Sequence, residues 1–380
     1  MKRQIILAGT FLTFALTQTG ISQMNQPPSA VPSCGTEMAM AKMPVELKKL
    51  TAAAAAAVQT GELLLYINFN PNGTVVRPGF GNADTLTSSL VDGVRFCPAP
   101  LLNQEQKDEI VKLVSDDFSP FNIRVTTDEV EFAAHPRFTK QMCLLSTLPS
   151  VIGHPSTTGG VSPFIGVGSR LPGDFAFAFS AAYGNDPRDV AAVISHESAH
   201  LLGLGHQHLF ADTCSFIYEY HPGFGSGPLA FKPLMGNGIG NGISNWFAQS
   251  CPSPTLGPPQ IDYDLINSQV VARPDDFPDG PTGGVTDLNS ISGVLERPGD
   301  VDFVMVNFRN PGPVVITSDN IDLKVSLVNP GGRVMDEFND PDSTNVIVPS
   351  AKGMRYLKIE AASNDNMSAQ FMTGTYHVSY

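Results

Sequence analysis

Three histidines and one glutamate in a short stretch of the chain have the spacing that a hydrolytic metal site requires. His196 and His200 are four residues apart, so on a helix they lie on one face and can direct two imidazole nitrogens at one ion. Glu197 directly follows the first histidine, so its carboxylate would lie beside the metal and take a proton from a water molecule that the metal activates. The pattern therefore predicts a metal site with one position open for water.

A glycine and a further histidine extend this pattern to HExxHxxGxxH. Gly203 permits a positive φ that ends the helix and turns the chain back, so that His206 supplies a third nitrogen. The two added residues make a chance match much rarer than for the bare HExxH motif. Asp186 and Pro187 have the residue types of a helix N-cap and first helical position, ahead of an apolar face. We therefore expect a zinc ion held by three histidines, with Glu197 as general base.

These residues resemble the metzincin zinc metallopeptidases, whose pattern combines the long motif with a later methionine turn. The candidate turn is the PLMG run that contains Met235. The resemblance implies that Met235 forms an apolar floor under the zinc ligands, while a methionine that fills a gap in the core is the alternative. It also implies an α+β catalytic domain with a mixed sheet and an active-site helix. Asn237 stands where some branches of the family have a tyrosine that assists at the metal.

Composition limits the classes of protein to which this chain can belong. Its 380 residues, 42% of them hydrophobic, suffice for two globular domains. The formal net charge of −13 argues against a nucleic-acid partner. An acidic surface makes Ca²⁺ a candidate second cofactor, but no complete EF-hand loop locates a site, and the pair Asp300 and Asp302 does not make one. The sequence indicates no oligomeric state.

The first residues have the features of an export signal. Residues 1–22 combine a basic start, a short apolar core and small residues near the end, as in a secretory signal peptide. No later stretch reaches the roughly 20 apolar residues that a membrane span needs. We therefore expect a soluble protein that is secreted or held in a periplasm. Residues 23–61, which are rich in methionine, alanine and proline, are predicted to be a propeptide.

Five cysteines in an exported chain predict disulfides with one cysteine left over. Cys97, Cys143, Cys214 and Cys251 allow three pairings, of which Cys97 with Cys143 and Cys214 with Cys251 is the most local. Cys34 stands apart, in the propeptide. It resembles the cysteine switch of several secreted metzincins, in which a propeptide thiolate occupies the open zinc position until the propeptide is removed. A free or incidentally paired Cys34 is the alternative.

The catalytic domain is expected over residues 62–272, where strand and helix patterns alternate. The elements predicted ahead of the metal motif are strands at 63–69, 122–127, 159–168 and 175–181, a helix at 103–117 and the motif helix itself. The family resemblance implies that an edge strand at residues 161–167 pairs with the substrate backbone, with an ordinary sheet strand as the alternative. His208 and His221 are expected at the surface or beside the ligands rather than on the metal.

A second domain is expected after a linker at residues 273–288, which is rich in proline, glycine and acids. Residues 289–380 alternate apolar runs with turns, a pattern typical of a β-sandwich or jelly roll. The predicted strands are 291–295, 301–308, 314–317, 323–328, 345–348, 356–361 and 375–379. The GVL, GDVDF and GTYHV phrases resemble the bacterial pre-peptidase C-terminal (PPC) domain, which commonly follows secreted peptidases.

The combined pattern predicts an exported zinc endopeptidase that hydrolyses protein or peptide substrates and is kept latent through Cys34. An exported binding or adhesion protein is the alternative from another class; its C-terminal sandwich would carry the function and its peptidase-like domain would be an inactive scaffold. A zinc hydrolase with a downstream glutamate as third ligand is disfavoured, because His206 stands where the long motif expects a histidine ligand.

Overall fold

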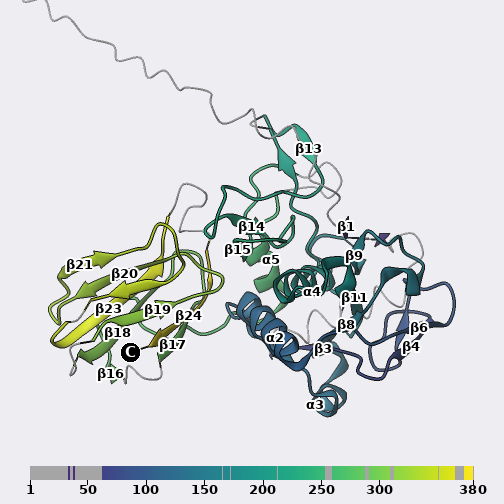
Figure 1. The fold of residues 1–380 in the computed structure, drawn as a ribbon, viewed down its shortest axis with the longest axis horizontal. Coiled ribbons are helices and arrows are strands. Elements are labelled where there is room, and N and C mark those ends of the chain that lie inside the picture. The colour runs from purple at the N-terminus through teal and green to yellow at the C-terminus, as the bar shows by residue number, and fades with distance from the viewer. Residues whose placement is uncertain are drawn as a thin grey trace, which may run out of the picture. The chain divides into compact units, whose positions relative to one another are not determined.

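The computed structural model describes residues 33–34, 37–38 and 62–379, apart from 165, 172, 212, 253–258, 287–290, 309–311, 350 and 364–371 (Figure 1). The predicted signal peptide and most of the predicted propeptide lie outside the described residues. Among the described residues, no helix is both long and apolar enough to cross a membrane.

A six-stranded sheet organises the first part of the chain, with the strand order β1-β9-β11-β8-β3-β7. Its strands are β1 Ser33–Cys34, β3 Leu63–Asn68, β7 Ile123–Thr126, β8 Lys140–Ser146, β9 Thr158–Val161 and β11 Phe175–Phe179. All neighbours are parallel except β9 and β11, which are antiparallel. Helices α2 (Gln104–Phe118) and α4 (Pro187–Leu201) contact each other and share a core with one face of the sheet. The sheet is therefore mixed and carries both helices on one face.

The central strands are buried on both faces, because apolar side chains alternate between two clusters. Leu63 and Leu65 of β3 pack on the side of the helices, whereas Leu64 and Tyr66 belong to a cluster on the opposite side. Strands β8 and β11 are likewise buried at every residue. Continuous apolar runs of this kind are typical of parallel strands covered on both faces.

Local sequence signals fix the starts of the two large helices. Asn103 caps α2 in a capping box with Gln106, close to the predicted start of that helix. Asp186 caps α4 by accepting backbone N–H groups, and Pro187 occupies the first turn, as predicted. Every residue of α4 from Val190 to Leu201 is buried, so this helix lies inside the domain rather than on its surface.

Shorter elements complete this part of the chain. They are β2 Glu37–Met38, β4 Thr74–Pro78, β5 Thr87–Ser88, β6 Arg95–Cys97, α3 Glu129–Ala134, β10 Pro163–Phe164, β12 Leu209–Phe210, β13 Phe216–Tyr218, β14 Phe231–Pro233, β15 Ile243–Asn245 and α5 Asp262–Gln269. The strand predicted at 159–168 is broken into β9 and β10, since Pro163 has no N–H to donate to a ladder. The candidate substrate strand at 161–167 is therefore reduced to Val161 and the two residues of β10. Strand β8 was not predicted, because Lys140 and Gln141 at its start hide the apolar run.

The C-terminal part of the chain forms two antiparallel sheets that share one apolar core, apart from one parallel pair at β16. One sheet has the order β16-β18-β23-β20-β21 and the other β17-β24-β19-β22. Their strands are β16 Val285–Thr286, β17 Ile291–Leu295, β18 Val301–Phe308, β19 Val314–Thr317, β20 Leu323–Val328, β21 Val334–Phe338, β22 Val346–Val348, β23 Gly353–Ala361 and β24 Gly374–Ser379. The predicted two-sheet architecture of this region is confirmed. The prediction missed β16 and β21, whose residues are mostly exposed and carry little apolar alternation.

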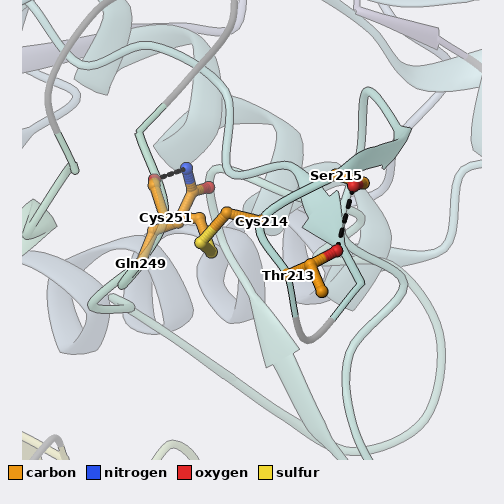
Figure 2. The surroundings of a disulfide bond; sticks show 5 residues. All are labelled: Thr213, Cys214, Ser215, Gln249 and Cys251. Atoms are coloured by element: carbon orange, nitrogen blue, oxygen red, sulfur yellow. Dashed lines mark hydrogen bonds between the residues drawn. A yellow bond between two sulfur atoms is a disulfide. The ribbon is translucent and has the colours of Figure 1, made fainter.

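The structure forms one of the two local disulfides that the cysteine spacing suggested. Cys214 and Cys251 are bonded, which ties the segment before β13 to the segment after β15 (Figure 2). The Cys97–Cys143 pairing is wrong: both are buried free thiols. Cys143 packs on the helix side of the sheet and Cys97 in the cluster on the opposite side, so the sheet itself separates their sulfur atoms.

We predict that alkylation of the denatured, unreduced protein modifies Cys97 and Cys143 but neither Cys214 nor Cys251. In the native protein the first two thiols should resist the reagent, because both are buried and burial raises the pKa of the Cys97 thiol to about 11. Peptide mass spectrometry reads out each site, with a reduced sample as the control for full labelling. A peptide pair cross-linked through Cys97 and Cys143 would contradict the structure.

Candidate metal centre

His196 and His200 project from the C-terminal half of α4, and each is held by a backbone carbonyl. His196 Nδ1 lies 2.6 Å from the Leu234 carbonyl oxygen, and His200 Nδ1 lies 2.7 Å from that of Leu204. Because a carbonyl oxygen can only accept a hydrogen bond, both Nδ1 atoms carry the proton. Each Nε2 therefore has its lone pair, and the two Nε2 atoms lie 3.1 Å apart.

The turn at Gly203 brings the third histidine back to the same point. Gly203 has a φ of +86°, as predicted, and a Cβ there would lie 2.5 Å from the backbone nitrogen of Ser169. The Gly203 carbonyl also accepts a hydrogen bond of 2.8 Å from the Gly168 N–H. Only glycine satisfies both the positive φ and the close approach. His206 follows three residues later, and its Nδ1 donates to Glu219 Oε1 at 3.1 Å.

The chemistry of these donors fits a metal ion. One nitrogen from each of the three rings lies within 4.8 Å of the other two. Two neutral imidazoles cannot hydrogen-bond through facing lone pairs, so a cation between them is the arrangement that satisfies both. Ligand nitrogens about 2.0–2.1 Å from one tetrahedral ion lie about 3.3 Å apart, close to the observed 3.1 Å between His196 and His200. The His196, His200 and His206 group can therefore hold a metal ion.

Burial keeps the three imidazoles in the neutral form that binds metals. It lowers the pKa of His196 to about 4. It also lowers the pKa values of His200 and His206 well below the usual range, with the neighbouring histidines adding to the effect. The rings are 5%, 0% and 6% exposed, which shows that the chain encloses this group rather than presenting it on the surface.

Glu197 lies one residue from the first ligand, directly beneath strand β9. A Cβ on Gly160 of this strand would lie 2.5 Å from both Cγ and Oε1 of Glu197, so the backbone of β9 passes immediately over the carboxylate. Gly160 is also the residue with which Cys34 of β1 pairs in parallel register. The segment around Cys34 therefore follows β9 beside Glu197. The position of the Cys34 side chain lies outside what the structure describes.

The turn that contains Met235 contacts the metal centre through its backbone. The Leu234 carbonyl orients His196, and the Met235 carbonyl accepts from the N–H of Gln207, next to His206. The Met235 side chain is fully buried within the core that α4 shares with the sheet. This burial agrees with the predicted position of Met235 beneath the ligands.

Two neighbours of the centre that the sequence analysis missed, Glu219 and Tyr220, directly follow strand β13. Glu219 accepts from His206 through its carboxylate, and its backbone carbonyl accepts a 2.7 Å hydrogen bond from His208 Nδ1. The centroid of the Tyr220 ring lies 4.5 Å from that of His206. A tyrosine therefore lies beside one of the ligands, although position 237, where some metzincins have a tyrosine, is an asparagine. No sequence motif indicates these residues, since only the folded segment after β13 places them near His206.

His208 and His221 were expected either at the surface or beside the ligands, and the structure excludes the surface because both are buried. His208 is buried and contacts Phe210 and Phe216, and its backbone N–H donates to Gln249 Oε1. His221 is buried against Phe224 and Phe247. Neither belongs to the group that can hold a metal ion, so both support the loop that carries His206.

A buried polar network anchors that loop to α5. Gln207 Nε2 donates to Asp262 Oδ1 at 2.6 Å, and Gln260 Nε2 donates to the same oxygen at 2.8 Å. The Phe247 N–H donates to the other carboxylate oxygen of Asp262 at 3.0 Å. The disulfide between Cys214 and Cys251 restrains the far end of the same loop (Figure 2). His206 is thus positioned by a loop that is fixed at several points.

No protein-family model matches this chain, and no curated protein matches it. The case for a metal centre therefore depends on the chain's own geometry.

We expect Glu219→Ala to weaken Zn²⁺ binding about tenfold, the lower end of the range for partners that orient a ligating histidine, since Glu219 is exposed. Glu219→Gln keeps an acceptor for His206 Nδ1 and should retain more of the affinity. A competition titration with a chromophoric chelator measures both variants, and Glu109→Ala, at an exposed position on α2, is the control. Equal affinities for all four proteins would show that Glu219 does not position His206.

We expect Asp262→Asn to flatten the dependence of stability on pH. Burial raises the Asp262 pKa to about 7, despite three hydrogen bonds that lower it. The folded protein therefore binds this proton more tightly than the unfolded chain. Stability from this group is present below about pH 4 and lost as pH rises toward 7, by up to about 1.4 kcal/mol per pH unit.

Urea unfolding of wild type and Asp262→Asn at pH values from 4 to 7.5, at equal zinc, measures this difference. Asp264→Asn, at an exposed position of the same helix, should follow the wild-type profile. Parallel profiles for wild type and Asp262→Asn would show that the Asp262 carboxyl does not titrate in this range.

Proposed function

We propose that this protein is an exported zinc endopeptidase of the metzincin type, followed by a PPC-like β-sandwich domain. The observation that carries the proposal is the convergence of three neutral imidazoles: His196 and His200 lie with the buried Glu197 on α4, and His206 comes from the loop after it. The long motif, the positive φ at Gly203 and the turn at Met235 support the same assignment. The two-sheet architecture of the C-terminal part supports the PPC-like assignment.

His196, His200 and His206 would hold the zinc ion. Bound zinc supplies Lewis-acid polarisation of a peptide carbonyl and lowers the pKa of water toward about 7. The carbonyls of Leu234 and Leu204, with the Glu219 carboxylate, keep the protons on Nδ1 and thus hold the rings in the ligating orientation. Nitrogen-only protein ligands favour zinc over calcium or magnesium, which prefer oxygen.

Glu197 would transfer the proton in both halves of the reaction. It would take a proton from the attacking water and then donate it to the leaving amine nitrogen, so one carboxylate serves as base and then as acid. Glu197 follows His196 on α4, and its carboxylate lies against Gly160 of β9. A carboxylate restrained in this way needs little reorganisation between the two proton transfers.

The N-terminal segment supports a latent form of the enzyme. Strand β1 pairs with β9, and β2 pairs with β10, both in parallel register. An extended substrate that adds to β9 would need the same backbone groups. Removal of the segment around Cys34 would therefore open the strand for substrate, and a Cys34 thiolate on the metal would add to the block. The disulfide Cys214–Cys251 agrees with export to an oxidising compartment.

We expect Glu197→Gln to abolish casein digestion, by a factor of at least about 10², while stoichiometric zinc remains bound. Wild-type protein should lose activity with a chelator and regain it with zinc. Metal content is measured by atomic spectrometry on the same samples, with Glu109→Gln as the matched control. Each protein is assayed before and after removal of residues 1–61. Substantial digestion by purified Glu197→Gln would exclude this residue as the base, and absence of zinc from folded wild-type protein would exclude the proposed function.

A further inference from the structure

The strand pair β14–β15 contacts both the candidate metal centre and the C-terminal sheets, which are strands β16 to β24. Leu234 and Met235, which directly follow β14, belong to the core that α4 shares with the six-stranded sheet. Phe231 of β14 belongs instead to the apolar core of the C-terminal sheets, and Phe224 and Phe247 pack against that core. The strand pair is therefore in contact with two cores, one of which carries the candidate metal ligands.

Asn245, the last residue of β15, is at the centre of a polar contact with the C-terminal sheets. It is 2% exposed, and its Nδ2 lies 2.7 Å from the Asn320 carbonyl oxygen and 2.8 Å from the Thr373 carbonyl oxygen. Because a carbonyl oxygen can only accept, Nδ2 donates to both. Its Oδ1 accepts from the Trp246 N–H at 2.7 Å. The whole amide is thus hydrogen-bonded, as a buried amide requires.

The backbone of the same residue leads to a candidate metal ligand. The Asn245 carbonyl accepts a 2.9 Å hydrogen bond from the Leu234 N–H, and Asn245 pairs with Pro233 in the parallel register of β14 and β15. The Leu234 carbonyl in turn accepts from His196 Nδ1 at 2.6 Å. Both polar backbone atoms of Leu234 are therefore engaged, one by Asn245 and the other by His196.

Asn320, in the segment between β19 and β20, makes a reciprocal contact with the end of α2. It is 5% exposed, and its Nδ2 donates to the Asp116 carbonyl at 2.9 Å. This carbonyl is one of the last in the helix, which need partners from outside it. Asn320 Oδ1 accepts from the Thr375 N–H at 3.2 Å, and a Cβ on Gly374 would lie 2.5 Å from the same oxygen. The contact is therefore both polar and closely packed.

Charged side chains flank the two asparagines. Asp319 pairs with Lys112 of α2 and lies 3.5 Å from Arg188 Nη2 in the first turn of α4. Each of these three side chains is at least 36% exposed, so the ion pairs contribute little to stability. The specificity of the contact therefore comes mainly from the buried amides of Asn245 and Asn320.

We propose that the C-terminal sheets support the candidate metal centre, and that Asn245 and Asn320 are the positioning residues through which they do so. The contact fixes β15, β15 fixes Leu234, and the Leu234 carbonyl fixes the imidazole of His196. Partners that orient a ligating histidine contribute to metal affinity. Loosening the contact therefore lowers the affinity for Zn²⁺, although neither asparagine belongs to the group that can hold the ion. The inference rests on the zinc site of the proposed function but not on peptidase turnover.

Zinc affinity is compared in the full chain carrying Glu197→Gln, which prevents self-digestion. A competition titration with a chromophoric chelator is carried out on this parent and on its Asn245→Ala and Asn320→Ala forms, at a temperature where urea unfolding shows that each protein is folded. Both substitutions should weaken Zn²⁺ binding about three- to tenfold. This is less than the loss of about 10- to 100-fold that follows removal of a partner bonded directly to a ligating histidine.

Two matched variants control for a general loss of stability. Asn339 Nδ2 donates to the Leu323 carbonyl at 2.8 Å within the C-terminal sheets, so Asn339→Ala removes the same kind of hydrogen bond away from β15. Val325→Ala removes apolar volume from the core of the same sheets. Both should bind zinc as the parent does.

Hydrogen exchange measures the coupling without metal. In the zinc-free parent the Leu234 N–H, which donates to Asn245, should be protected from exchange. The peptide that covers residues 231–237 should exchange at least about fivefold faster in Asn245→Ala and Asn320→Ala than in the parent, and at the parent rate in Asn339→Ala.

Equal zinc affinity in the parent and both contact variants overturns the proposal. An equal loss in Asn339→Ala and Val325→Ala also overturns it, because affinity would then follow the general stability of the C-terminal sheets. If Asn245→Ala does not fold, Asn320→Ala decides. If the parent binds no zinc, the proposed function fails, and the exchange of residues 231–237 decides the coupling: an unchanged rate in the contact variants overturns it.

Discussion

The candidate metal centre depends on one electrostatic constraint: neutral imidazoles whose lone pairs face one another are best satisfied by a cation between them. Each ring is set in this orientation by a hydrogen bond from Nδ1, and each acceptor comes from a different segment. The Leu234 carbonyl belongs to the turn before Met235, the Leu204 carbonyl to the turn after Gly203, and the Glu219 carboxylate to the segment directly after β13. The helix, both turns and the segment after β13 must therefore fold together before the centre exists.

Burial performs two tasks at this centre. It keeps the histidines neutral, and it places the Glu197 carboxylate against a strand instead of bulk water. Both depend on the sheet, because the apolar strands hold α4 inside the domain and β9 passes directly over Glu197. Gly160 has no side chain at the point of closest approach. A larger residue there would collide with Glu197 and push the strand away from the helix. The packing of the core therefore also positions the candidate catalytic residues.

Local signals predicted much of this arrangement. The cap at Asp186, the spacing of His196 and His200, and the positive φ at Gly203 each depend on residues a few positions apart, and the structure agrees with all of them. The alternating runs of the C-terminal part likewise identified most of its strands. The contributions of Glu219 and Gly160 depend on contacts between segments distant in sequence, which periodicity does not encode. The Cys97–Cys143 pairing failed for the same reason, since short separation along the chain does not show which face of a sheet a side chain occupies.

A second group of converging side chains is acidic: ligand oxygens of Asp275, Glu296 and Asp302 lie within 4.8 Å of one another. At the histidine centre the converging imidazole rings are neutral, and the surrounding segments supply hydrogen-bond acceptors that fix the orientation of the rings. Around the β17–β18 turn the converging groups are carboxylates, and Arg297 pairs with Asp279 and Asp300. Asp302 occupies a core-facing position of β18, where burial raises the pKa of its carboxyl to about 8. From the strand pattern alone, Asp302 is predicted to be an ordinary acidic residue near a turn. Its burial follows from the packing of β18 between the two sheets, which the sequence pattern does not show.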